Sequence, residues 1–346
     1  KIAAFWGGQA GSLLFWLLLI GLFAAVSVWR ASSVPSSLLP WVYATQGVVM
    51  LFFAVLVAFV ANPFVRLPAA QVPAEGMGLN PLLLNPWMVV HPPALLIGYA
   101  GTTLPFAFAI AALASGRVDE TWVRLARRWA LFTFTFLTLG IVLGAYWAYV
   151  ELGWGGYWAW DPVENASLMP WLVLVAYLHS SMIQERRGML KIWNVSMAPL
   201  TFLLAIYGTF LTRSGIISSV HAFAKSSIGT WFLVFMVLTA LLVLALIVRR
   251  LPALRANGSL ESFFSREAAV WATNILLVGT TLVIWFLTML PAISELWSGN
   301  QLTAEPIQFT RATRPWFLAI VLLMGVAPLV AWRKMSPGRL MRLLWP

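Results

Sequence analysis

A short stretch of the sequence, residues 154–171, contains four tryptophans, one tyrosine and two adjacent glycines. Its rings offer flat, polarisable surfaces, and its glycines let a ligand or another backbone approach closely. This composition predicts a platform for a large planar apolar ligand. An aromatic belt at a membrane interface is the alternative, but such a belt needs neither clustered glycines nor this density of rings. The candidate platform residues are Trp154, Gly155, Gly156, Tyr157, Trp158, Trp160, Asp161 and Trp171.

Two carboxylates lie inside this stretch. Asp161 is followed by Pro162 and, three residues later, by Glu164. The pair could move protons, but the spacing is that of a capping box, with Asp161 as N-cap, proline at the first helical position and Glu164 at the third. Because capping explains both carboxylates, we interpret them as the start of a helix, and no catalytic acid or base is identified.

Two of the three histidines lie near loops on either side of the platform in sequence. His91 precedes Pro92 and Pro93, and His221 ends the run Ser-Ser-Val-His. Since proline disfavours helical geometry in the residue before it and suits the first position of a helix, we expect His91 just ahead of a helix that begins at Pro92. Two neutral imidazoles are suitable axial ligands for haem iron. The alternative is that each histidine caps a helix or bonds a carbonyl.

The third histidine, His179, lies inside an apolar run, about 7 Å from its inner boundary at the rise of an α-helix. An ionisable side chain at such depth is a candidate functional residue. One histidine cannot provide two axial ligands. Either its partner lies outside this chain, or His179 relays protons or bonds a neighbouring helix.

Four arginines complete the set of candidates. They are expected in connections on the same side as the platform, where they could pair with carboxylates such as haem propionates. A plain loop charge explains each of them equally well. These residues are Arg66, Arg213, Arg311 and Arg314.

The elements that must position these residues are membrane helices. The chain has 346 residues, of which 61% are hydrophobic and 10% charged, and its mean hydropathy is +0.86. Soluble proteins carry about 25% charged residues. Nine apolar runs are long enough to span a bilayer, so we predict an all-α polytopic membrane protein that forms one domain over residues 1–346. The runs cover residues 12–29, 41–60, 94–114, 129–150, 168–183, 192–212, 231–248, 269–290 and 315–332.

The basic residues predict the orientation of these spans. One alternate set of connections holds 16 of the 22 Lys and Arg residues and the other set holds 6. The richer set is expected to face the cytoplasm, which makes the net charge of +11 a topology signal and argues against a nucleic-acid partner. The platform, residues 151–171 between the fourth and fifth spans, then faces outward, as do residues 62–90, 213–229 and 291–314.

Other features limit the possible chemistry. The chain has no cysteine, which excludes disulfides, thiolate metal sites and a cysteine nucleophile. It has no phosphate-binding loop, dinucleotide glycine motif or zinc-protease helix. Because it begins with Lys1 and not with Met, we expect a piece of a longer protein.

Residues 154–161 resemble the tryptophan-rich WWD signature of haem-handling membrane proteins. Their continuation to Trp171 is similar to the CcmF family, the haem lyases of System I cytochrome c maturation. The resemblance extends to Ala-Ala-Phe-Trp-Gly-Gly-Gln-Ala-Gly-Ser from Ala3, to His91-Pro-Pro, to Leu178-His-Ser and to the segment from Arg213 to His221. It covers almost the whole chain.

The resemblance implies a bacterial inner-membrane protein whose platform faces the periplasm and receives haem from a chaperone (CcmE-like). His91 and His221 would be the axial ligands of this transient haem. The cysteines of a Cys-x-x-Cys-His segment in apocytochrome c would add to the haem vinyl groups as thioethers. Partners that hold and reduce the apocytochrome (CcmH/CcmI-like) would keep its thiols available. His179 matches one ligand of an intramembrane haem b, whose second histidine falls outside this chain.

Two other classes of protein stay open. One is a haem exporter or chaperone-loading protein that shares the WWD signature without ligation activity; the Asp161-Pro-Val-Glu-Asn continuation argues against it. The other is a transporter of ions or solutes. Transporters usually carry charged residues near the middle of the membrane, where only His179 is a candidate here, and it lies off-centre.

Overall fold

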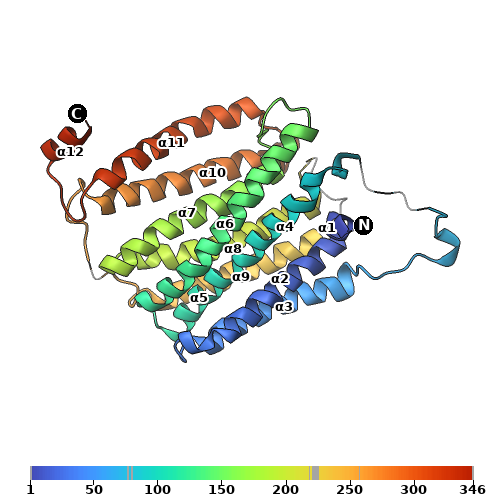
Figure 1. Ribbon diagram of the computed structural model, residues 1–346, viewed down its shortest axis with the longest axis horizontal. Helices are drawn as coiled ribbons and strands as arrows, with labels where there is room; N and C mark the ends of the chain where they lie inside the picture. The colour runs from blue at the N-terminus through green and yellow to red at the C-terminus, as the bar shows by residue number, and fades with distance from the viewer. Residues whose placement is uncertain are drawn as a thin grey trace.

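The computed structural model describes residues 2–75, 78, 81–217, 219, 226–256 and 258–344, and this part of the chain contains helices and no strand. Nine of its helical segments are long and apolar enough to cross a membrane. They pack side by side as one bundle (Figure 1). The prediction of an all-α polytopic membrane protein is therefore confirmed.

The nine spans correspond to the nine apolar runs. The first four are α2 (Gln9–Trp29), α3 (Leu39–Val55) with a π-helical turn (Leu56–Val60), α4 (Pro86–Gly101) with α5 (Thr103–Ser115), and α6 (Glu120–Glu151). The other five are α7 (Pro162–Arg187), α8 (Lys191–Ser214), α9 (Ile228–Arg250), α10 (Arg266–Ser298) and α11 (Pro306–Val326). Two short helices, α1 (Ile2–Gly7) and α12 (Pro337–Leu344), lie near the termini, and 3₁₀ turns occupy Ala31–Ser33, Ala69–Gln71, Pro81–Leu83 and Ala327–Leu329.

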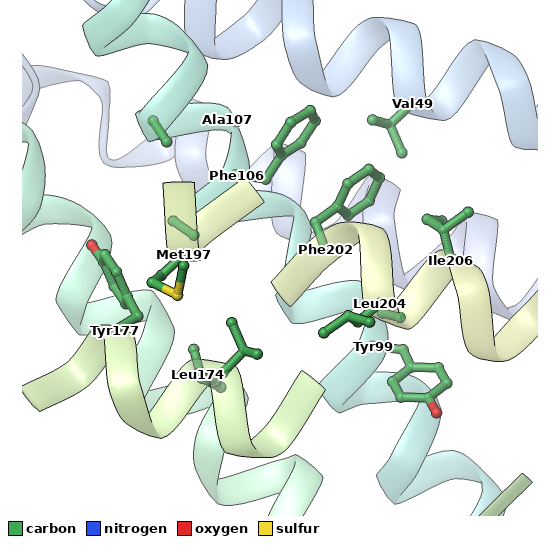
Figure 2. Packing of buried hydrophobic residues seen from close by; sticks show 14 of the residues in the cluster. Val49, Tyr99, Phe106, Ala107, Leu174, Tyr177, Met197, Phe202, Leu204 and Ile206 are labelled. Carbon is green, nitrogen blue, oxygen red and sulfur yellow. The ribbon is translucent and has the colours of Figure 1, made fainter. Parts of the chain in front are cut away.

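The centre of the bundle is built from α5, α7 and α8. Phe106 of α5 stacks on Phe202 of α8, with ring centroids 4.4 Å apart and planes 7° apart, and Figure 2 shows these rings among the packed aliphatic side chains. The spans formed by α9 and α11 are mostly exposed, as expected for helices at the edge of a bundle that face lipid. Figure 1 shows α10 and α11 along one edge and α2 and α3 along the opposite edge.

The connections rich in Lys and Arg lie at one end of the bundle, called the basic end, and the other connections lie at the opposite end. At the basic end, Arg117 Nη1 donates to Ser37 Oγ over 3.2 Å, and Arg250 Nε donates to the Leu113 carbonyl over 2.8 Å. Contacts at the other end join Trp6 to Met88, Gln9 to Ser226, Asn85 to Glu151 and Trp160 to Thr310. The platform segment therefore lies at the end opposite to most of the arginines.

The helices extend beyond the predicted apolar runs, and in α8, α10 and α11 the extension changes where candidate residues lie. α8 continues to Ser214, so Arg213 is a helical residue and not a loop residue. α10 passes through Pro291 to Ser298, and α11 begins at Pro306, so the expected loop of residues 291–314 is wrong. Arg311 and Arg314 lie within α11. The physical reason is the capping box of Glu305 and Gln308, which starts α11 nine residues before the expected position.

Candidate functional site

The platform segment connects α6 to α7. Trp160 has a left-handed backbone with φ of 59°, a conformation that costs about 1–2 kcal/mol in an L-residue. Two contacts stabilise this geometry. The Asn165 side chain donates to the Trp160 carbonyl over 3.0 Å, and the Trp160 indole donates to Thr310 Oγ1 over 3.1 Å. The indole also stacks on Phe309, with centroids 5.4 Å apart and planes 13° apart.

The structure brings some of the platform rings together and separates others. Trp158 and Trp160 meet nearly at right angles, with centroids 6.0 Å apart. Tyr157 stacks on Tyr149 of α6 instead, 4.4 Å between centroids. Trp171 lies in α7, where its indole donates to Thr138 Oγ1 over 2.8 Å. The other candidates of the segment, Trp154, Gly155 and Gly156, are in the connection itself, where Trp154 is half-buried.

Asp161 and Glu164 form the expected capping box. Asp161 Oδ2 accepts from the Val163 amide over 3.0 Å, and Glu164 Oε2 accepts from the Asp161 amide over 3.2 Å. The interpretation of the two carboxylates as the start of a helix is confirmed. Asp161 has a further role that the sequence did not indicate, because Ser219 Oγ donates to its Oδ2 over 2.7 Å.

His91 lies inside α4, and the expectation of a helix beginning at Pro92 is wrong. The helix begins at Pro86, where the Asn85 side chain accepts from the Trp87 amide over 2.9 Å. Pro92 lacks the amide that would pair with the Met88 carbonyl four residues earlier. The indole of Trp6 donates to that carbonyl over 3.1 Å and so satisfies it.

The His91 ring is held against α6. Its Nδ1 lies 2.8 Å from the Gly140 carbonyl, and its plane lies 28° from that of Trp147 with centroids 5.9 Å apart. A carbonyl only accepts, so Nδ1 of the neutral ring carries the proton and Nε2 carries the lone pair. The hydrogen bond to a carbonyl, which was one alternative for His91, is therefore present. It also orients the ring, and metal-ligating histidines are usually oriented by such a bond.

His91 borders two cavities. One, of about 160 Å³, lies between α2, α4, α7 and α8, and also has Trp16, Tyr99 and Arg213 in its walls. The other is smaller and joins His91 to Trp158 and to Glu164. His91 and the platform ring of Trp158 therefore border the same space.

Arg213 is buried, and its Nη2 donates to Ser12 Oγ over 2.7 Å. It is the one arginine of the four candidates that borders the His91 cavity within the described part of the chain. Arg66, Arg311 and Arg314 are exposed. The sequence did not single out Tyr99 or Trp16, because buried aromatic residues in apolar runs carry no distinguishing pattern; Ser12 lies in one of the motifs of the resemblance.

His221 lies outside the described residues. The described residues on either side of His221, Ser219 and Ser226, make contacts at the site. Ser219 bonds Asp161, and Ser226 Oγ donates to the carbonyl of Arg213 over 3.3 Å. These two contacts tie the flanks of this segment to the start of α7 and the end of α8.

His179 belongs to a different region. It lies 18 residues after Asp161 along α7, which corresponds to about 27 Å at the rise of an α-helix. Its Nδ1 is buried and has no hydrogen-bond partner among the residues that the structure describes. Within the same residues no group of three or more His, Asp or Glu side chains is arranged to hold a bare metal ion.

The fold and the site define a multi-pass helical membrane protein with an aromatic, histidine-containing cavity at one end of the bundle. Residues 6–221 match the model of the cytochrome C assembly protein family, and the chain belongs to that family.

Individual relatives are similar over nearly the whole chain. The cytochrome c-type biogenesis protein ccl1 of Rhodobacter capsulatus is 42% identical over 347 residues, covering 100% of this chain and 53% of the relative. The cytochrome c-type biogenesis protein CcmF of Escherichia coli K12 is 44% identical, covering 99% and 53%. A solved structure of the cytochrome c haem lyase CcmF matches with a TM-score of 0.76 at 34% identity, covering 99% of this chain and 50% of that one. The chain thus spans about half the length of these relatives.

Proposed function

We propose that this protein is the haem lyase component of cytochrome c maturation. The observation that carries the proposal is His91, whose ring is oriented by the Gly140 carbonyl and borders the same cavity as Trp158. In the reaction, each cysteine thiol of apocytochrome c adds across one haem vinyl group. Sulfur bonds to one vinyl carbon and hydrogen to the other, so the addition itself consumes no oxidant or reductant.

The residues of this chain bind and orient the haem substrate. His91 supplies one axial nitrogen and His221 the other, while Trp158 and Trp160 pack against the porphyrin. Arg213 is a buried cation in the wall of the larger of the two cavities that His91 borders, which suits it to a haem propionate. Holding thiol and vinyl group in reactive geometry supplies much of the rate enhancement that such an addition requires. A haem exporter would need the same platform but no site for the apocytochrome.

His179 is proposed as one ligand of a resident haem b, with the second histidine outside this chain. His179 lies in the membrane-spanning part of α7, and its Nδ1 has no hydrogen-bond partner within the described residues. An iron-ligating imidazole binds the metal with one nitrogen and needs a neighbouring group at the other nitrogen to orient it. His179 fits such a ligand. When bound, haem b supplies electrons one at a time. In this chain His179 would hold its iron.

We place the basic end of the bundle in the cytoplasm and the platform in the periplasm of a bacterial inner membrane. The partners follow from the proposed reaction. They are a haem chaperone that delivers the substrate, apocytochrome c, and proteins that hold the apocytochrome and reduce its thiols. Each of them would act at the platform end.

The proposal is tested by the absorbance spectrum of the full-length protein purified from membranes. We expect a reducible b-type spectrum in the wild type and its loss in the His179→Ala variant, with haem delivery to the platform partly retained. A transporter would show no haem absorbance. An unchanged spectrum in the variant would assign His179 to packing or proton relay.

A further inference from the structure

A cavity of about 290 Å³ lies at the basic end of the bundle, among α2, α3, α5 and α6. Arg30 and Arg128 belong to its lining and are exposed, and Tyr43 lies in its wall. The rest of the wall is largely aliphatic and aromatic, including Val42 and Phe108. The cavity is separate from the proposed haem sites, since neither His91 nor His179 borders it.

Ser27 and Ser33 of the lining make hydrogen bonds within the protein, but three other polar groups of the cavity make none in the described part of the chain. Within the described residues, neither guanidinium makes a hydrogen bond or an ion pair, and the buried Tyr43 hydroxyl has no hydrogen-bond partner. Arg250, at the same end of the bundle, differs because its guanidinium donates to the carbonyls of Leu113 and Ala114. An unpaired buried hydroxyl next to lipid is costly. A ligand that forms hydrogen bonds with the Tyr43 hydroxyl and the two guanidiniums would remove this cost.

We propose that this cavity binds one anionic diacyl phospholipid. The phosphate lies between the guanidiniums of Arg30 and Arg128, and an acyl chain runs along the apolar wall beside Val42 and Phe108. The Tyr43 hydroxyl donates to an oxygen of the lipid. Basic pockets between membrane helices select anionic headgroups in this way, and arginine suits phosphate through its paired donors.

The test uses native mass spectrometry of the delipidated full-length protein titrated with three probes: dioleoylphosphatidylglycerol, dioleoylphosphatidylcholine and glycerol phosphate. We expect the first to bind more tightly than the second, and glycerol phosphate to bind poorly because it has no acyl chain. Combining Arg30→Gln with Arg128→Gln should weaken phosphatidylglycerol binding about tenfold or more, since two charged hydrogen bonds are lost. Tyr43→Phe should weaken it about threefold.

Arg124→Gln is the matched control, because Arg124 is an exposed residue one turn from Arg128 that does not line the cavity. It should leave binding unchanged. The double lysine variant, Arg30→Lys with Arg128→Lys, should recover part of the affinity and so separates loss of charge from loss of folding. Equal affinity for the two lipids, or wild-type affinity in the double glutamine variant, would overturn the proposal.

A second inference comes from the packing of α7 against α10. Two contacts fix the register of this antiparallel pair. Asn165 Nδ2 donates to Thr288 Oγ1 over 3.0 Å towards the platform end, and Arg187 lies 3.6 Å from Glu267 at the basic end.

His179 lies fourteen residues after Asn165 in α7, and Asn274 lies fourteen residues before Thr288 in α10. The two therefore lie at the same depth. Fourteen residues are nearly four helical turns, so each lies within about 40° of the face that carries the contact of Asn165 with Thr288.

Both side chains are incompletely hydrogen-bonded. Asn274 is fully buried, and within the described residues neither its amide nitrogen nor its oxygen has a partner. The Nδ1 of His179 lacks one too. Unsatisfied polar atoms in an apolar interface are costly, and a rotation of either side chain that joins the two would satisfy His179 Nδ1 and the Asn274 oxygen.

We infer that Asn274 is a positioning residue for His179. Its side-chain oxygen accepts from Nδ1–H and leaves the lone pair on Nε2. This inference rests on the proposed role of His179 as an iron ligand. An acceptor on the outer nitrogen makes an iron-ligating imidazole more electron-donating, which favours ferric iron and lowers the midpoint potential of the haem.

The experiment is a spectro-electrochemical titration of haem b in the full-length protein. Asn274→Leu, similar in size but without an acceptor, should shift the midpoint potential upward, and Asn274→Asp, which keeps an acceptor oxygen, should prevent that shift. Thr281→Val is the control, because the buried Thr281 hydroxyl bonds the Leu277 carbonyl of its own helix; we expect no shift.

The outcomes separate the two ideas. Loss of the spectrum in His179→Ala with an unchanged potential in Asn274→Leu would overturn the role of Asn274 alone. Survival of the spectrum in His179→Ala would contradict the ligand assignment on which the inference rests.

Discussion

The position of His91 depends on two glycines of α6. Gly140 offers its carbonyl to Nδ1, and Gly144 leaves space for the ring, since a Cβ at that position would lie 2.6 Å from Cε1. No real Cβ contact is so short, so any side chain at position 144 must displace the imidazole. Alanine favours a helix more than glycine does, so an effect of alanine at position 144 would come from the displaced imidazole and not from the helix itself.

We accordingly predict that Gly144→Ala reduces cytochrome c maturation about tenfold or more, because small displacements of a positioned group are costly. Gly47→Ala in α3 is the control, as nothing lies within 4 Å of its added Cβ. It should leave maturation unchanged, with alanine favoured over glycine in a helix. Maturation assayed in cells, with protein levels measured in parallel, would show the difference. Full activity of Gly144→Ala would mean that the ring position is unimportant.

At the scale of the helix, α7 begins where its capping box places it. Asp161→Ala removes the acceptor for the Val163 amide and for Ser219, and should lower the free energy of unfolding by about 1 kcal/mol or more. Asp161→Asn keeps an acceptor oxygen and should lose much less. Thermal unfolding in detergent measures both. Equal loss in the two variants would show that charge, and not capping, is what Asp161 contributes.

The helices themselves were predictable because a bilayer requires long apolar runs, and the α7 cap because its spacing is local. The ends of helices near proline were not. Pro92 and Pro291 lie inside α4 and α10, which membrane helices tolerate when another group satisfies the freed carbonyl. For Pro92 the freed carbonyl is that of Met88, and the group that satisfies it is Trp6, 82 residues before Met88, so no local pattern around His91 could reveal it.

For the whole molecule, the separation of its two ends has a direct test. The connections that hold most of the basic residues lie opposite the platform, so one end should face the cytoplasm and the other the periplasm. A reporter fused after Gly156 should register as periplasmic, and one fused after Gly188 as cytoplasmic. Alkaline phosphatase activity, which requires export, gives the readout. The reverse pattern would place the proposed haem site on the wrong side for a periplasmic apocytochrome.

The central claim is that the platform end of the bundle binds haem through His91 and His221. The most direct test is cytochrome c maturation by His-to-Ala variants of the full-length protein. We predict that His91→Ala and His221→Ala each abolish maturation while the protein still inserts, and that added imidazole partly restores it by filling the vacated axial position. Trp158→Ala should reduce maturation without rescue, because a packing surface is lost and not a ligand. Full maturation by the variant that lacks both histidines would contradict the claim.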